Sequence, residues 1–217
     1  NNDKKKSYKL LPSSPFSEID GIHYPDLNKS LESHCKKITK NITRLKCNGV
    51  NHSSVLEYFQ VKKPKLVIYS GFGGEIVPEK LLSLNIPFLH IHSGLLPEYR
   101  GSTTIYYSIL KDFMCGVSAI LLDTEIDKGP IIASRSYPPP PPNIDIDYLY
   151  DNAIRANLLT DVLNDWLVEL NFNNLFSQKN GDISPYYVIH PVLKHLALLG
   201  LENGSIHERF DELYSKL

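Results

Sequence analysis

Four runs of apolar and β-branched residues in the middle of the chain predict the strands of one sheet. In each run the apolar residues follow one another almost without interruption, as in strands that are buried on both faces. Such strands are typical of parallel sheets, whose two faces are covered by helices. The predicted strands are residues 65–74, 86–94, 115–123 and 129–138.

Segments whose apolar residues have helical spacing alternate with these strands. Residues 53–64 begin with two serines that suit an N-cap and end at a proline, and residues 78–85 carry a proline at the first helical position. In residues 101–112, Ser102 is the expected cap of a third helix. The alternation of strands and helices predicts an α/β fold with a largely parallel, twisted sheet flanked by helices.

These patterns divide the chain into three parts. Residues 1–41 are polar and interrupted by prolines, so we expect an irregular N-terminal segment. Residues 42–142 form the expected core, which a short strand at 42–48 opens and the proline run 138–142 closes as an extended connector. Residues 143–217 are expected to be a helical extension that packs on the core.

The extension begins with a long predicted helix, residues 147–170. Its stripe of apolar residues at helical spacing is expected to face the core. The stripe consists of Leu149, Ala153, Ala156, Leu159, Leu163 and Leu167. A further helix in residues 185–197 is expected to pack either on the sheet or on a second subunit, which leaves a homodimer open.

Composition narrows the classes of function. Among 217 residues, Lys plus Arg number 23 and Asp plus Glu number 24, and this balance argues against nucleic acid or an anionic membrane as the main partner. Three cysteines at wide spacings predict neither a disulfide framework nor a cysteine zinc site. No apolar run is long enough to span a membrane, and no secretory signal is recognisable, so a cytoplasmic location is expected.

The candidate chemistry begins at the end of the second predicted strand. Side chains alternate along a strand, so His90 and His92 are expected on one face and their neighbours on the other. Ligands of α/β proteins bind beyond the carboxyl ends of strands, which is where these histidines lie. In the loop between the last two strands, Asp123 or Asp127 is expected to approach one of the histidines.

Three interpretations of this cluster stay open on the residues alone. In the first, His92 and Asp127 form an acid–base pair for acyl transfer. In the second, the two histidines and an aspartate hold zinc or iron. In the third, the histidines are core residues with satisfied hydrogen bonds.

Three stretches of the chain resemble formyltransferases that use 10-formyltetrahydrofolate. That family, which includes glycinamide ribonucleotide, methionyl-tRNA and amino-sugar formyltransferases, carries the motif Asn-x-His-x-Ser-Leu-Leu-Pro-x-x-x-Gly, followed by an Asp-Gly-Pro type segment. The similar stretches here are HIHSGLLPEYRG (90–101), GVSAILLDTEIDKGPII (116–132) and GFGGEIVPEKLL (71–82). The resemblance implies a Rossmann-like fold and 10-formyltetrahydrofolate as the formyl donor.

The resemblance also implies roles for individual residues. His92 matches the catalytic histidine and Asp127 the catalytic aspartate, and His90 would share their site. An amine would attack the formyl carbon directly while His92 stabilises the oxyanion and Asp127 orients His92, with no metal ion. The residues that match the border of the pterin pocket are Phe72, Gly74, Ile76, Val77, Asp123, Thr124, Glu125 and Ile126.

The chain departs from the family in two places. His90 stands where the family has asparagine, whose amide donates a hydrogen bond without titrating, so His90→Asn is expected to be tolerated or to improve transfer. The opening KSYKLLPSSPF (6–16) lacks the apolar strand and glycine turn with which the family begins. The first strand–helix unit is therefore expected to be absent or diverged.

The acceptor is expected to be a small primary amine, such as an amino sugar or an amino-acid-like molecule. Transfer RNA is not expected, because the chain has neither a basic excess nor the length for an added barrel domain. The residues expected to contact the acceptor are Ser93, Gly94, Tyr99, Arg100 and Tyr106. The alternatives are a formyltetrahydrofolate hydrolase, an inactive folate- or nucleotide-binding relative, and a metal-dependent hydrolase that uses His90 and His92.

Overall fold

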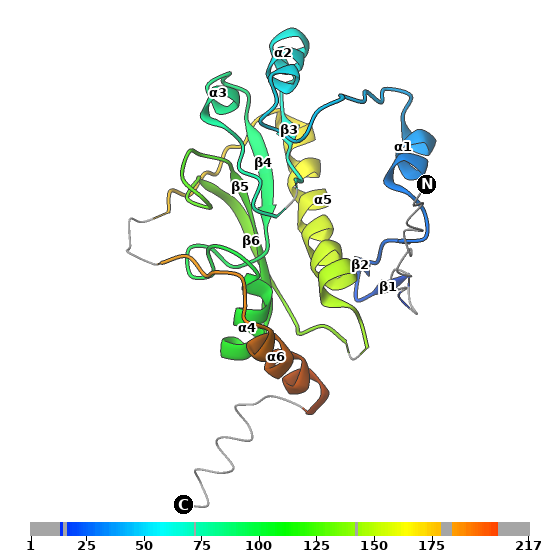
Figure 1. The fold of residues 1–217 in the computed structure, drawn as a ribbon, viewed down its shortest axis with the longest axis vertical. Coiled ribbons are helices and arrows are strands. Elements are labelled where there is room, and N and C mark those ends of the chain that lie inside the picture. Colours follow the sequence, from blue (N-terminus) through cyan, green and yellow to red (C-terminus); the bar gives the residue numbers. More distant parts are fainter. Residues whose placement is uncertain (1–13, 15–16, 72, 142, 179–183, 204–217) are drawn as a thin grey trace, which may run out of the picture.

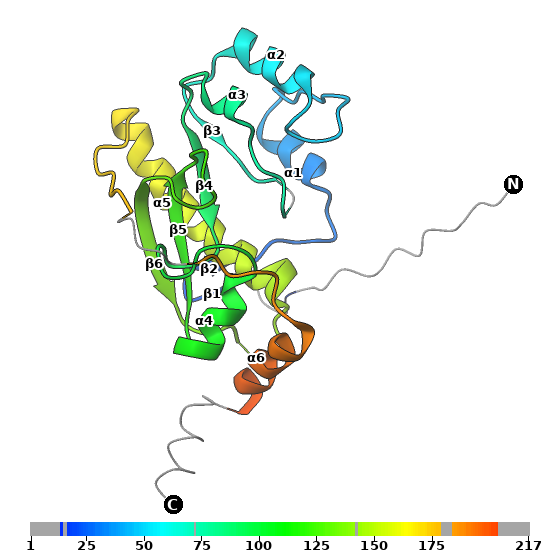
Figure 2. The ribbon, with the colours of Figure 1, turned by 60° about the vertical axis from the view of Figure 1, so that its left-hand side comes forward.

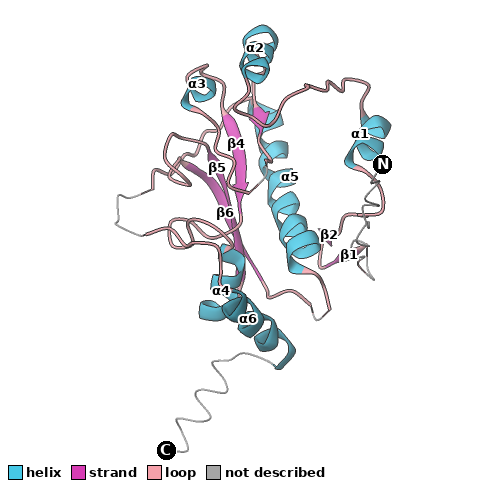
Figure 3. Cartoon of the chain, in the orientation of Figure 1, coloured by secondary structure: helices cyan, strands magenta, loops and turns pink. Residues whose placement is uncertain are grey.

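The computed structural model describes residues 14, 17–71, 73–141, 143–178 and 184–203, and a four-stranded sheet lies at its centre (Figures 1 and 3). The sheet has the order β3-β4-β5-β6. Its strands are Val67–Ile68, Phe88–His92, Cys115–Leu121 and Ile131–Tyr137. With helices packed against this sheet, the structure confirms the α/β, Rossmann-like class.

The prediction of a largely parallel sheet was wrong, because the sheet is mixed. Only β3 and β4 run parallel, whereas β4–β5 and β5–β6 are antiparallel pairs. Helix α4 (Thr104–Asp112) follows β4 without carrying the chain back along the sheet, so β5 returns in the opposite direction, with Ser118 beside His92. An uninterrupted apolar run indicates that both faces of a strand are covered. It does not indicate whether the strand runs parallel or antiparallel to its neighbours.

Strand β3 is much shorter and more exposed than its sequence predicts. Of residues 65–74 only Val67 and Ile68 are strand, and Ile68 is 47% exposed at the edge of the sheet. Residues 42–48 form no strand at all. An apolar run in an edge strand resembles one in a central strand, because the sequence of a strand does not indicate whether another strand pairs with each of its edges.

The helices between the strands follow the prediction closely. Helix α2 spans Ser53–Lys62 and α3 spans Glu79–Leu82. Helix α4 begins one residue later than expected: Thr103, with φ of 51°, is its N-cap and makes no side-chain capping bond. The backbone N–H of Ser102 instead donates to the carbonyl of Tyr186, which attaches a distant segment to this turn.

The long C-terminal helix packs on the sheet through a face that coincides only in part with the predicted stripe. It starts as a π-helical turn, η1 (Ile146–Tyr150), and continues as α5 (Asp151–Glu169), which contacts β4, β5 and β6 (Figure 1). Leu149 and Ala153 are buried as expected, but Ala156 and Leu167 are exposed, and Leu159 and Leu163 are only half-buried. The rest of the buried face is formed by Ile154, Leu158 and Val162.

Part of the N-terminal segment belongs to the same core. Strands β1 (Glu18–Ile19) and β2 (Ile22–His23) form a small antiparallel hairpin against α5 (Figure 2). Ile22 and Tyr24 are buried in the main core. Helix α1 (Leu31–Ile38) follows and buries none of its residues, so the segment predicted to be irregular is only partly so.

The last described element is α6 (Pro191–Asn203), which packs on α4. Its side chains Val192, Leu193 and Leu196 are substantially exposed, and the predicted homodimer stays a prediction. Within the described residues, no helix combines the length and hydropathy that a membrane span requires.

Candidate active site

Strand β4 places two histidines on one side of the sheet. Leu89 and Ile91 point into the main core, and the alternating residues His90 and His92 point to the other side, as predicted. His92 is 5% exposed and His90 is partly buried. Both therefore occupy a site with little water, where electrostatic interactions are strong.

His92 and Asp127 form the pair that the sequence predicts. Nδ1 of His92 lies 3.4 Å from Oδ1 of Asp127, although the two residues are far apart in sequence. On the other edge of the ring, Nε2 of His92 donates to the carbonyl of Tyr99 at 2.7 Å. A carbonyl only accepts, so the proton on Nε2 is fixed and Nδ1 is the atom that faces Asp127.

The position of the Asp127 carboxylate is set by the backbone conformation of Asp127 and by a hydrogen bond from the motif that follows β4. Its φ of 54° lies in the left-handed region, which aspartate tolerates better than most residues. Its Oδ2 accepts the backbone N–H of Gly101 at 3.1 Å, which leaves Oδ1 directed at His92. The loop 122–130 and the loop after β4 are thereby joined at the site.

Two glycines allow the backbone to close around this pair. A Cβ on Gly94 would lie 2.4 Å from the carbonyl oxygen of Tyr99, the acceptor of the His92 hydrogen bond. Gly101 has φ of 109°, and a Cβ there would lie 2.3 Å from the carbonyl oxygen of Tyr186. A side chain at either position would displace the groups that hold His92 and Asp127.

His90 is bound on one edge of its ring and open on the other. Its Nδ1 donates to the carbonyl of Tyr69 at 3.1 Å, so Nε2 carries a lone pair in the neutral ring. Burial lowers the pKa of His90, and the hydrogen bond to Tyr69 offsets this only in part. The neutral side chain thus presents an acceptor, where the asparagine of the family motif would present an amide donor.

Two residues that sequence reasoning missed hold the loops of the site. Ser118, fully buried on β5, accepts the N–H of Leu96 at 3.0 Å and donates to the carbonyl of Gly94 at 2.8 Å. Gln178 donates through Nε2 to the carbonyl of Asp127 at 2.8 Å. Ser118 lies inside a predicted strand, but no local signal marks either residue.

Of the predicted acceptor contacts, Ser93 and Gly94 lie next to the pair. The hydroxyl of Ser93 donates to Asp151, which is in turn 3.2 Å from Nε of Arg155 on the same helix. Arg155 is close enough to contribute to the lowered pKa of His90. Ser93 thus connects the motif after β4 to α5 and to a partly buried charge pair.

The aromatic residues predicted to contact the acceptor are used in packing. Tyr106 is 2% exposed, and its hydroxyl donates to Asp147 at 2.7 Å. Tyr99 is also buried, donates to Asp112 and stacks on Tyr186. Burial raises the pKa of both phenols. The side chain of Arg100 is buried as well.

The residues predicted to border the pterin pocket divide into exposed and buried ones. Ile76 is 52% exposed, whereas Val77 is buried beside Leu81 and Phe88. Gly74 adopts φ of 84° in the same loop, and Phe72 lies outside the described residues. Ile76 rather than Val77 is therefore available to a ligand.

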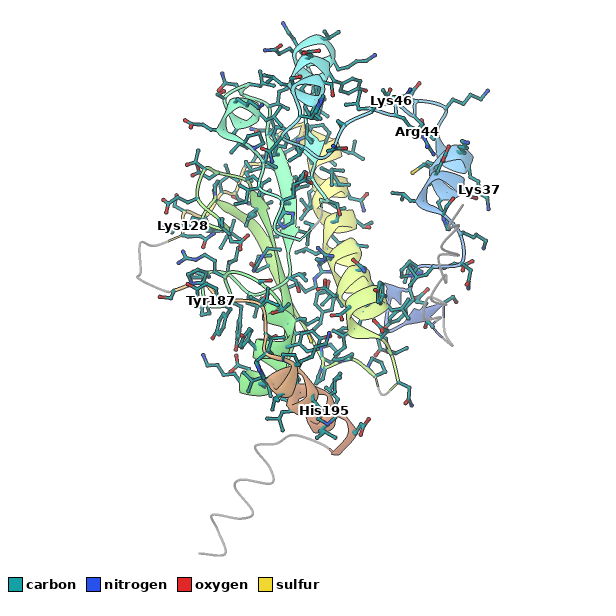
Figure 4. All side chains as sticks on the ribbon, viewed as in Figure 1. Lys37, Arg44, Lys46, Lys128, Tyr187 and His195 are labelled. Atoms are coloured by element: carbon teal, nitrogen blue, oxygen red, sulfur yellow. The ribbon has the colours of Figure 1, made fainter. Side chains whose placement is uncertain are left out.

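The second predicted part of that pocket is the exposed loop after β5. Asp123 accepts the N–H of Thr124 at 2.6 Å, and Glu125 pairs with Lys128, which Figure 4 labels on this loop. Ile126 is 57% exposed. The loop thus offers one apolar side chain and backbone groups ahead of Asp127.

The structure also keeps the metal interpretation open. His90, His92 and Asp127 each bring one potential ligand atom to within 4.8 Å of the others. Two imidazoles and a carboxylate are common ligands of zinc and of non-haem iron. The acid–base and metal interpretations use the same three side chains.

Comparison with known proteins identifies a family whose matched region contains this site. The sequence model described as formyl transferase matches residues 23–154, which is more than half of the chain and includes all three side chains. A methionyl-tRNA formyltransferase of Pelobacter propionicus is 30% identical over 164 residues, covering 74% of this chain and 45% of that protein. The chain spans about half or less of the length of the curated relatives it matches.

Solved structures share the fold at low sequence identity. A 4-N formyltransferase from Francisella tularensis has a TM-score of 0.52 at 18% identity, covering 78% of this chain and 73% of that one. A methionyl-tRNA formyltransferase from Clostridium thermocellum has a TM-score of 0.50 at 18% identity, with coverages of 63% and 57%. This likeness concerns the fold, and the matched sequence model, which covers more than half of the chain, shows that the chain belongs to the formyl transferase family.

Proposed function

We propose that this protein transfers a formyl group from 10-formyltetrahydrofolate to the primary amine of a small acceptor, either an amino sugar or an amino-acid-like molecule. The observation that carries the proposal is the buried pair of His92 and Asp127, 3.4 Å apart, with His90 on the same side of β4. The pair lies within the region that matches the formyl transferase model.

His92 and Asp127 would act on the charge that develops during transfer. As the amine nitrogen bonds to the formyl carbon, negative charge grows on the formyl oxygen, and a proton on Nδ1 of His92 stabilises it. Asp127 stabilises the protonated ring. When the bond from the formyl carbon to the folate nitrogen breaks, the proton lost by the amine is passed to that nitrogen.

His90 suits a different task from the asparagine it replaces. With Nδ1–H held by the carbonyl of Tyr69, neutral His90 accepts at Nε2 and gives no hydrogen bond to an oxyanion there. It would instead accept the proton of the attacking amine, so that, unlike the expectation from the family motif, His90→Asn should lower transfer. The proposal therefore assigns the formyl oxygen to His92 and the acceptor amine to His90.

The donor site is proposed at the two exposed loops that flank the pair. Ile76 and Ile126 supply exposed apolar side chains for the pterin, and the backbone of residues 123–126 supplies polar groups. Titration with a stable 10-formyltetrahydrofolate analogue tests this site. Ile76→Asp should abolish binding, whereas Val61→Asp, at an 80% exposed position on α2, should leave it unchanged. Equal affinity of all three proteins would place the donor elsewhere.

The class of acceptor is proposed from the net charge of the chain. The net charge of −1 offers little attraction to a polyanion, which favours a small amine. Relatives are named for methionyl-tRNA and for 4-N formylation. Incubation with 10-formyltetrahydrofolate and a panel of amino sugars, amino acids and methionyl-tRNA, read by mass spectrometry, decides among them. Formylation of the tRNA alone would refute the small-acceptor proposal.

Variants of the pair test the chemistry itself. His92→Ala and Asp127→Ala should each lower turnover by about 100-fold or more, because general acid–base catalysis is lost. The control His195→Asn changes a histidine that is exposed on α6, as labelled in Figure 4, and should keep full activity. Near-normal turnover of His92→Ala would contradict the assignment. Consumption of the donor without any acceptor would point to hydrolysis.

A further inference from the structure

Both histidines of β4 are oriented as metal-binding histidines are. Each donates the proton of one ring nitrogen to a backbone carbonyl, His90 from Nδ1 to Tyr69 and His92 from Nε2 to Tyr99. In the neutral ring, the opposite nitrogen of each histidine then carries a lone pair. A metal-bound histidine almost always has such a partner, which sets its tautomer and the direction of its ring.

Asp127 completes the arrangement in the same way. Its Oδ2 accepts the backbone N–H of Gly101, and its Oδ1 is directed at Nδ1 of His92. All three side chains therefore have one polar atom held by the backbone and another left for the site. Hydrogen-bonded second atoms are the usual support of metal ligands.

The distance between His92 and Asp127 equals that between two ligands of one small cation, and His90 lies nearby. Ligand atoms about 2.0–2.1 Å from a tetrahedral zinc ion lie about 3.4 Å from one another. The separation of Nδ1 of His92 from Oδ1 of Asp127 is 3.4 Å, and the ligand atom of His90 lies within 4.8 Å of both.

We propose that His90, His92 and Asp127 bind one divalent transition-metal ion of the zinc type, with a fourth position open to water or a ligand. Two imidazoles and one carboxylate, with one free position, form the donor set of many zinc sites. His90 is the residue that creates the set, since asparagine at its position would leave one histidine and one carboxylate. The proposal goes beyond formyl transfer.

The ion and the transfer reaction would exclude each other. A cation between His92 and Asp127 occupies the atoms that are proposed to act on the formyl oxygen. Zinc should therefore inhibit transfer in competition with the donor, and chelation should reverse the inhibition. Metal binding itself is measured without folate, so its outcome does not depend on the proposed activity.

Calorimetric titration of the chelator-treated protein with zinc chloride tests the site. The parent should bind one zinc ion per chain. His90→Asn should lower the affinity for zinc by about 10- to 100-fold. His195→Asn removes an exposed histidine from α6 and should bind like the parent. Equal binding by His90→Asn and the parent, or no binding by the parent, would overturn the proposal.

The visible spectrum of bound Co²⁺ tests the site with the parent protein alone, so the test does not depend on whether a variant folds. A four-coordinate site of two imidazoles and a carboxylate gives intense absorption bands, whereas Co²⁺ on exposed side chains is six-coordinate and almost colourless. Intense bands from the parent, displaced by one equivalent of zinc, are expected. Weak bands alone would refute the site even if His90→Asn failed to fold.

Discussion

Gln178 holds the backbone of Asp127, 51 residues earlier in the chain, through a hydrogen bond of 2.8 Å from its side-chain amide. The same amide group donates to the carbonyl of Gly129 at 2.9 Å. One side chain thus spans the turn that presents the Asp127 carboxylate to His92. Gln178 acts on the site as a positioning residue, since it contacts the backbone of Asp127 and not the imidazole.

Replacement of Gln178 should affect turnover more than donor binding. Gln178→Ala removes both hydrogen bonds and lets the left-handed turn at Asp127 relax, which should lower kcat about 10- to 100-fold. KM for the donor should change little, because Ile76 and Ile126 are untouched. Steady-state kinetics give this split, and Gln178→Glu, which keeps the side-chain length but loses the donors, should resemble alanine. A parallel change in kcat and KM would indicate general loosening instead.

Ser118 should contribute to stability through the loop after β4. Ser118→Ala leaves the N–H of Leu96 and the carbonyl of Gly94 without this partner in a buried place, so the free energy of unfolding should fall by about 1–3 kcal/mol. Urea denaturation measures the difference. Ser136→Ala, at an exposed position on the neighbouring strand, is the matched control and should have almost no effect.

Gly101 should tolerate no side chain. Gly101→Ala places a Cβ 2.3 Å from the carbonyl oxygen of Tyr186 at φ of 109°, so both the local contact and the hydrogen bond to Asp127 should be lost. We expect a lower melting temperature together with reduced turnover. Gly73→Ala has no atom within 4 Å of its Cβ and should melt like the parent. Equal melting temperatures for the two variants would contradict the close approach at Gly101.

The three cysteines should react at two different rates. Cys115 is fully buried in β5, and burial raises the pKa of its thiol, with a smaller effect from Asp151. Because the thiolate is the reactive form, Cys115 should stay protonated and unlabelled in the folded protein at about pH 8. Cys35 and Cys47 are partly exposed and should be labelled first. Three equal rates before denaturation would contradict the burial of Cys115.

Local patterns determined the residues of the site but not all of their partners. Alternation along β4 placed His90 and His92 together, and the Asp-Gly-Pro type segment after β5, through its resemblance to the family, identified Asp127. Tyr106 illustrates the opposite case, since a tyrosine near a motif has the same local sequence whether it faces a ligand or Asp147. Gln178 had no local signal because its partner is distant in the chain.

The sequence by itself determined the α/β class, the order of the main strands and helices and, through its resemblance to formyltransferases, the pair of His92 and Asp127. These properties follow from hydrophobic spacing and motif residues, which act over a few positions of the chain. The tertiary structure alone decided the antiparallel directions of β5 and β6, the exposed edge at β3 and the buried face of α5. Each of these depends on which distant segment of the chain covers a surface. The residues adjacent in sequence do not determine the free energy of that contact.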